Sequence, residues 1–220
     1  MSTTRNEAAK KEILQRVHNA LTLSGAPASV EHAQARRSTV ERGSAELRAL
    51  LVDRLEDYKA TVVETTEDEL SARIAAVLHE RDCSHVVYAP GLPTSLFADF
   101  TGNARPDNTS DDPRMLGEVD AVVTDSHVTC ALTGTITLES GPQCGRRALS
   151  LVPDRHVVIV RDKTVVYGVP EMIARLNPDT PATMISGPSA TSDIELVRVE
   201  GVHGPRDLIV FLVSSADPQP

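Results

Sequence analysis

The sequence is poor in cysteine and in aromatic residues. It holds three cysteines, three phenylalanines, three tyrosines and no tryptophan among its 220 residues. Three scattered cysteines, none of them in a CxxC pair, cannot build a disulfide framework or supply the four thiolates of an iron–sulfur cluster. The scarcity of aromatic rings also leaves few surfaces on which nucleic-acid bases could stack. We therefore expect that this chain binds no cofactor by itself.

Basic residues and long apolar runs are also in short supply. The chain has 22 basic against 31 acidic residues and a formal net charge of −9, whereas binding to nucleic acid or an anionic membrane requires a basic surface. Residues 1–16 are polar without the apolar core of a signal peptide, and no apolar run reaches membrane-spanning length. The sequence predicts a reduced, soluble, cytoplasmic protein without nucleic acid or membrane insertion among its partners.

Composition divides the chain into an N-terminal part, residues 1–43, and a main domain, residues 44–220. The first part contains a predicted helix over residues 6–23, whose apolar residues form a stripe at helical spacing. Residues 28–43 are charged and small, which predicts a linker. The main domain is long enough to bury a core of its own.

Helices and strands alternate in the first half of the main domain. Helices are predicted over 44–58, from the capping-box motif at 66–69 to about 81, and over 170–176; strands are predicted over 60–64, 85–89, 121–124, 134–138, 156–160, 164–166, 183–186 and 208–213. The strands 156–160 and 164–166 are expected to form a hairpin, and residues 101–113 a surface loop. The alternation predicts an open, mainly parallel α/β sheet with flanking helices and a hairpin-rich insertion.

The densest polar motif is GPSATSDIE at residues 187–195, followed by GVHGP at residues 201–205. Because ligands of open α/β sheets bind beyond the carboxyl ends of strands, we expect this loop to hold a small carboxylate or phosphate through backbone N–H groups and hydroxyls. The alternative is that the hydroxyls merely cap a turn. The predicted ligand-binding residues are Thr133, Gly134, Thr135, Gly187, Ser189, Thr191, Ser192 and Glu195.

Asp193 and His203 are the candidate catalytic residues, because a carboxylate and an imidazole could exchange protons near neutral pH. Each has a structural alternative, as a surface carboxylate and as a histidine that bonds a turn carbonyl. A metal site built from these two residues with Glu195 and His127 is a further alternative. No HxH, HxxxH or HExxH spacing is present, so we expect no metal.

A second polar stretch, residues 141–147, contains a cysteine between a glutamine and a glycine, followed by two arginines. Arg146 and Arg147 could bind an acidic substrate or partner, although paired arginines are more often solvated. Cys144 is the cysteine with the most electropositive neighbours in sequence. The remaining histidines, His156 among them, show no partnering pattern and are expected to be structural or exposed.

The two motifs at 187–195 and 201–205, together with TGT at residues 133–135, resemble the LUD (lactate-utilisation) domain, specifically its LutC/YkgG branch. The similarity runs from about Val119 to the last residue and extends back to about Ser44. It implies a NagB/RpiA/CoA-transferase-like α/β fold. Family members often carry glutamate where this chain has Leu132, and that departure counts against CoA-transfer chemistry.

The resemblance implies a LutC-like subunit of a system that oxidises L-lactate to pyruvate, with iron–sulfur clusters on partner subunits. This chain would then be a cluster-free accessory or ligand-binding component, non-catalytic or dependent on its partners. The alternative is a stand-alone NagB/RpiA-like isomerase or cyclo-ligase acting on a small phosphorylated or carboxylated substrate. A small-molecule sensor without catalysis is the third hypothesis.

Overall fold

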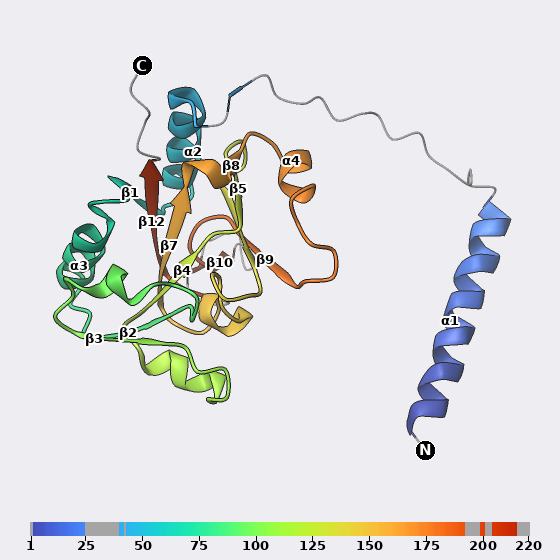
Figure 1. The fold of residues 1–220 in the computed structure, drawn as a ribbon. Helices are drawn as coiled ribbons and strands as arrows, with labels where there is room; N and C mark the ends of the chain where they lie inside the picture. Colours follow the sequence, from blue (N-terminus) through green and yellow to red (C-terminus); the bar gives the residue numbers. More distant parts are fainter. Residues whose placement is uncertain (1, 25–39, 42, 192–198, 201–203, 215–220) are drawn as a thin grey trace. The chain divides into compact units, whose positions relative to one another are not determined.

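A computed structural model of the chain describes residues 2–24, 40–41, 43–191, 199–200 and 204–214 (Figure 1). The chain forms two compact units, Met1–Arg36 and Arg37–Pro220. The first unit contains one long helix, α1 (Ser2–Ser24), as the apolar spacing predicts. The apolar side chains of this helix, from Ile13 to Leu21, are at least half exposed. None of the described helices is long and apolar enough to cross a membrane.

The centre of the second unit is a six-stranded sheet in which every pairing is parallel (Figure 1). In spatial order the strands are β1 (Thr61–Thr66), β12 (Asp207–Ser214), β7 (Arg155–Arg161), β4 (Ala121–Asp125), β2 (His85–Tyr88) and β3 (Asn103–Pro106). Strands buried on both faces are continuous in apolar residues, and β12 is buried from Leu208 to Val213. The predicted open parallel α/β sheet is confirmed.

The two faces of this sheet belong to different cores. Helix α3 (Leu70–Glu80) shares a core with Ile159 and Phe211, whereas helix α2 (Ala45–Asp57) shares a core with Val160 and Leu212. Successive residues of a strand point to opposite faces, so each long central strand fills both cores. Short 3₁₀ turns complete the described part of this unit: η1 (Thr94–Phe97), η2 (Pro113–Glu118), η3 (Arg147–Ser150) and η4 (Asp162–Thr164). Turn η1 contacts α3, η3 contacts β4 and η2, and η4 contacts β12.

A second sheet of four short strands joins the core of α2. Its order is β8 (Val165–Val166), β5 (Val128–Cys130), β6 (Thr135–Glu139) and β9 (Ala182–Ile185), and it is mixed, with β6 antiparallel to both neighbours. Ile136 and Leu138 pack with α2, while Val128 and Met172 of helix α4 (Val169–Ile173) form a small third core. The strand pair β10 (Ala190–Thr191) and β11 (Val199–Glu200) is antiparallel.

Two predicted local structures are wrong. Thr66 is the last residue of β1, and α3 begins only at Leu70 with Glu69 as an N-cap that makes no side-chain bond, so the capping box at residues 66–69 does not form. The predicted loop 101–113 contains the edge strand β3. An edge strand needs few apolar residues and tolerates proline, which explains why the polar sequence around Pro106 did not predict it.

The predicted hairpin of residues 156–166 is also wrong. Strand β7 lies in the six-stranded sheet and β8 in the four-stranded one, joined by the 3₁₀ turn η4. Within this turn the Thr164 hydroxyl donates to the Arg161 carbonyl over 2.7 Å, and Asp162 forms an ion pair with Arg48 of α2. These contacts hold the turn in a conformation that sends the chain from one sheet to the other.

Candidate functional site

A cavity of about 310 Å³ lies where the segment that follows β9 meets the segment that precedes β12. Ser186, Gly187 and Ser189 form one wall, and Gly204 and Pro205 another. The 3₁₀ turn η3 and the first residues of β7 and β12 close the remaining sides. The two sequence motifs that were expected to cooperate therefore border one cavity, to the extent that the structure describes them.

This cavity lies at the amino ends of β7 and β12, because His156 and Leu208, which line it, are the second residues of those strands. The expected position at the carboxyl edge of the parallel sheet is therefore wrong. The preceding strand β9 belongs to the four-stranded sheet, where it pairs antiparallel with β6, so its carboxyl end does not share an edge with the carboxyl ends of the parallel strands.

The carboxyl edge of the parallel sheet is instead occupied by ion pairs. Arg161 of β7 pairs with Asp125 of β4 and, over 3.0 Å, with Glu67, which follows β1. Burial raises the pKa of Asp125 above its usual value, and the Arg161 guanidinium partly offsets that rise. These ion pairs connect the carboxyl ends of β1, β4 and β7, and the charged groups at this edge compensate one another.

Three hydroxyls connect the TGT motif to the wall of the cavity. The hydroxyl oxygens of Thr133 and Thr135 lie 2.7 Å apart, and Thr135 makes a second hydrogen bond of 2.9 Å with the Ser186 hydroxyl. Ser186 borders the cavity. Residues separated by about fifty positions in the sequence are thus joined in one polar chain, as the predicted convergence of these segments requires.

Gly134 and Gly187 approach the end of helix α2. Both have positive φ, +59° and +79°, a conformation that favours glycine. A Cβ atom on Gly187 would lie 2.6 Å from Cβ of Tyr58, and one on Gly134 would lie 3.1 Å from Cβ of Arg54. Both glycines therefore allow their loops to pack closely against the end of α2.

The remaining predicted residues fall into two groups. Ser189 donates its backbone N–H to the Pro205 carbonyl over 2.7 Å, so the two motifs are hydrogen-bonded to each other. Thr191 lies in β10, where the structure describes the backbone. The other predicted residues lie outside the described residues: Ser192, Asp193, Glu195 and His203.

His156 is a cavity residue that the sequence did not single out. Its ring is 1 % exposed, and Nε2 shares a hydrogen bond of 2.8 Å with the Thr124 hydroxyl on the neighbouring strand. Burial lowers the pKa of His156 from 6.5 to about 4, so the ring is neutral at physiological pH. A histidine within an apolar strand carries no local motif, and only the pairing of β7 with β4 brings Thr124 beside it.

The adjacent arginines Arg146 and Arg147 have different surroundings. The Arg146 guanidinium donates to both carboxylate oxygens of the buried Asp107, over 2.8 and 3.0 Å, so it is a structural anchor. Arg147 is exposed and borders the cavity. The expected electropositive setting of Cys144 is wrong, because that thiol is 6 % exposed and burial raises its pKa to about 12.

The alternative metal site has no support among the described residues, which contain no group of three or more His, Cys, Asp or Glu able to hold a metal ion. His127 lies 3.0 Å from the Arg175 carbonyl and 3.5 Å from a carboxylate oxygen of Glu139. The other three residues of that hypothesis lie outside the described part of the chain.

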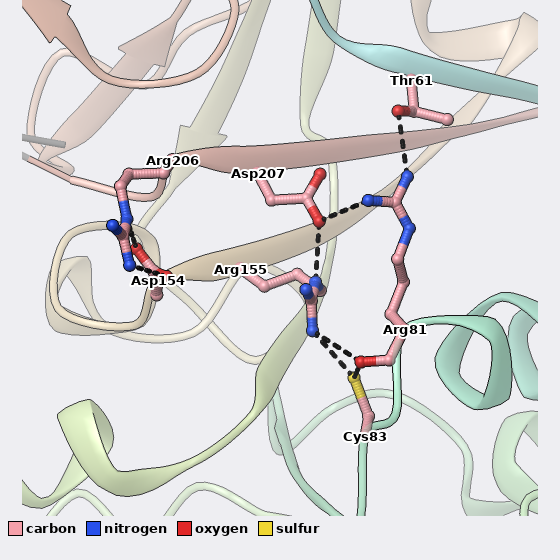
Figure 2. A network of polar contacts seen from close by, with 7 residues as sticks. All are labelled: Thr61, Arg81, Cys83, Asp154, Arg155, Arg206 and Asp207. Carbon is pink, nitrogen blue, oxygen red and sulfur yellow. Dashed lines mark hydrogen bonds and ion pairs between the residues drawn. The ribbon is translucent and has the colours of Figure 1, made fainter. Parts of the chain in front are cut away.

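A salt-bridge network covers the amino ends of the strands beside the cavity (Figure 2). Asp207, the first residue of β12, accepts from Arg155 over 2.7 Å and from Arg81 over 3.1 Å. Arg206 donates to both carboxylate oxygens of Asp154 over 2.6 Å, and these bonds lower the pKa of Asp154. Three arginines at this edge are thus already paired with carboxylates.

The fold and the cavity together define an open α/β protein with a cavity at the amino ends of two parallel strands. The family model of the LUD domain matches residues 42–213. The chain therefore belongs to the LUD domain family, in agreement with the resemblance of its motifs.

Proteins of known sequence and structure give the same result. A Lactate utilization protein C from Deinococcus radiodurans is 40% identical over 177 residues, which cover 77% of this chain and 80% of that protein. A Lactate utilization protein C from Bacillus subtilis is 30% identical over 56% of this chain and 57% of its own length. The crystal structure of a DUF162 family protein from Deinococcus radiodurans matches 77% of this chain and 97% of its own, with 33% identity and a TM-score of 0.64.

Proposed function

We propose that this chain is a LutC-like component of a system that oxidises L-lactate to pyruvate. The observation that carries the proposal is the 40% identity to a Lactate utilization protein C over four fifths of that protein's length. The cavity and the hydroxyl chain beside it support a ligand-binding role within such a system. We place this role in the cytoplasm, because the three cysteines are free thiols, as is typical of a reducing compartment.

The iron–sulfur clusters of the proposed system are assigned to partner subunits, and none to this chain. The positions of the cysteines support this division, because Cys83, Cys130 and Cys144 are all buried and belong to three different cores. A cluster needs about four thiolates or imidazoles around one centre. The chain would therefore contribute a ligand site or a docking surface and leave electron transfer to its partners.

Within this proposal the ligand is a small carboxylate or phosphate held by the loop 187–195 and the TGT motif. The hydrogen bond between Thr135 and Ser186 supports a shared polar wall. Asp193 and His203 are proposed to act on the ligand as proton donor or acceptor.

The decisive experiment measures lactate-dependent dye reduction by the purified chain, by the iron–sulfur subunits, and by their mixture. Activity in the mixture alone supports a partner-dependent component. Activity of the chain by itself would instead favour a stand-alone enzyme. No increase on adding the chain to its partners contradicts the proposal.

Variants of the proposed residues refine this test. Asp193→Ala and His203→Ala are expected to lower the activity of the mixture at least tenfold, since loss of a charge-assisted hydrogen bond costs about 1.5–3 kcal/mol. Asp179→Ala and His18→Ala, at exposed positions that are not part of the loop 187–195, serve as controls and should retain activity. Equal activity in all four variants would remove these two residues from the site.

A further inference from the structure

Arg147 lies at the rim of the cavity and has no partner for its charge among the residues that the structure describes. Within the described part of the chain its guanidinium makes no hydrogen bond or ion pair, whereas Arg146, next to it in sequence, is held by Asp107. The arginines of the neighbouring network are likewise paired, Arg155 with Asp207 and Arg206 with Asp154 (Figure 2). Among the described residues that line the cavity, Arg147 is therefore the one uncompensated positive charge, which suits a ligand with one anionic group.

The rest of the lining is divided into polar and apolar parts. Ser150 and Ser186 place hydroxyls at the cavity, and the Ser150 hydroxyl donates to the Arg147 carbonyl over 3.0 Å, so its oxygen can still accept. Met184 and Leu208 supply apolar surface. A pocket lined by apolar surface and a few polar groups binds ligands that carry both apolar and polar parts. We therefore expect the ligand to have an apolar part in addition to its anionic group.

The cavity is larger than a lactate ion requires. Scaled from the ~30 Å³ that a water molecule occupies in the liquid, a lactate ion takes up about 100–150 Å³. The cavity measures about 310 Å³, so lactate would leave more than half of it to water. An occupant of about ten or more non-hydrogen atoms comes closer to filling it.

The buried ring of His156 sets the polarity at the inner side of the cavity. Thr124 occupies its Nε2, and the ring lines the cavity without carrying charge at physiological pH. A neutral imidazole adds no second positive charge, so within the described lining a doubly charged phosphate monoester would meet a single cation, Arg147. This favours a carboxylate over a phosphate.

We propose that the cavity between η3, β9 and the start of β12 binds an amphipathic monocarboxylate larger than lactate, with its carboxylate on Arg147 and its apolar part against Met184 and Leu208. This inference deepens the ligand-binding part of the proposed function. Its test measures binding to the isolated chain, so it succeeds or fails separately from lactate oxidation.

Isothermal titration of the full chain with sodium octanoate, sodium lactate, 1-octanol and inorganic phosphate tests the proposal. Octanoate should bind, while lactate, octanol and phosphate should bind at least tenfold more weakly. Equal binding of octanol overturns the role of the anionic group, and equal or tighter binding of lactate overturns the size argument. Tighter binding of phosphate overturns the choice of carboxylate, and no octanoate binding at millimolar concentration overturns the proposal.

Three exposed substitutions then locate the site. Arg147→Ala should weaken octanoate binding about ten- to a hundredfold, and Met184→Asp should weaken it similarly by placing a negative charge on the apolar wall. Arg114→Ala is the matched control, because Arg114 is an exposed arginine of η2 that does not line the cavity and pairs with Asp112, the residue before η2, and it should leave binding unchanged. Unchanged binding in Arg147→Ala, or equal loss in Arg114→Ala, contradicts the assignment.

Discussion

At the scale of one residue, the conformation of Gly187 explains how the polar loop packs against the end of α2. Its φ of +79° lies in the left-handed region, and the end of α2 leaves no room for a side chain at this position. Residues other than glycine adopt this conformation at a cost of about 1–2 kcal/mol. The glycine in the GPS motif is therefore required by the packing of the loop on Tyr58, whatever the ligand.

The first prediction follows from this contact. Gly187→Ala should lower the free energy of unfolding by about 2–4 kcal/mol, because the strained φ and the clash with Tyr58 add. Gly117→Ala is the control: its new Cβ would lie 3.8 Å from the nearest neighbour, Val152, and stability should change by less than about 1 kcal/mol. Urea denaturation measures both, and similar midpoints for the two variants would contradict this account.

His156 gives a prediction about pH. Because its folded pKa of about 4 lies below the ordinary 6.5, the unfolded chain takes up a proton between these values while the folded chain does not. The free energy of unfolding should therefore fall as the pH drops from 6.5 to 4, with up to about 3 kcal/mol from this residue. It should be constant above pH 6.5 as far as His156 contributes.

The variant His156→Gln isolates that contribution, since an amide can still bond Thr124 but does not titrate. Denaturation curves at several pH values should show a shallower loss of stability in the variant between pH 6.5 and 4. Parallel curves for the two proteins would show that His156 takes up its proton equally in both states.

At the scale of elements, two helices with apolar residues at similar spacing behave differently. Leu51 of α2 is 0 % exposed and belongs to the core beneath the parallel sheet, whereas Leu14 of α1 is 58 % exposed. Leu51→Ala should cost about 2–5 kcal/mol of unfolding free energy. Leu14→Ala should change it by less than about 0.5 kcal/mol, and thermal denaturation that finds equal losses would contradict this distinction.

Elements with strong local patterns could be predicted from the sequence, but their partners could not. The helices and the central strands follow from periodicity and apolar runs, as in α2 and β12. The turn at Asp162 carries the local signal of a hairpin, but Asp162 forms an ion pair with Arg48, more than a hundred residues away, and β8 lies in another sheet. Strand pairing depends on such distant contacts, which local sequence does not encode.

The same distinction applies to the candidate site. Short polar residues and glycines identified the segments at 133–135 and 187–189, and the structure bonds Thr135 to Ser186, directly before the second segment. Other features of the site depend on how the two sheets are assembled. These are the position of the cavity, its buried histidine, and the different surroundings of Arg146, which pairs with Asp107, and Arg147, which borders the cavity. The sequence therefore identified the loops and the pair of arginines, and the fold adds His156 and shows which of the two arginines borders the cavity.

At the scale of the whole molecule, the division of the chain can be tested by truncation. The structure separates residues 1–36 from residues 37–220 as compact units, while composition divides the sequence at residue 43. Val40 lies between these boundaries and packs, partly buried, against the core of α2. The two boundaries therefore predict different stabilities for a shortened chain.

A chain that starts at Arg37 should unfold cooperatively at nearly the melting temperature of the full chain, because the apolar side chains of α1 are largely exposed. A chain that starts at Ser44 keeps the N-cap of α2, whose hydroxyl accepts from the Leu47 N–H, but loses Val40. Removing this half-buried side chain should cost about 1–2 kcal/mol, which lowers the melting temperature by roughly 2–8 °C in a domain of this size.

Calorimetry of the full chain and of the two truncated chains distinguishes these cases. Equal melting temperatures for both truncations would place the boundary at residue 43, and loss of the cooperative transition in the longer truncation product would show that residues 1–36 are part of the folding unit.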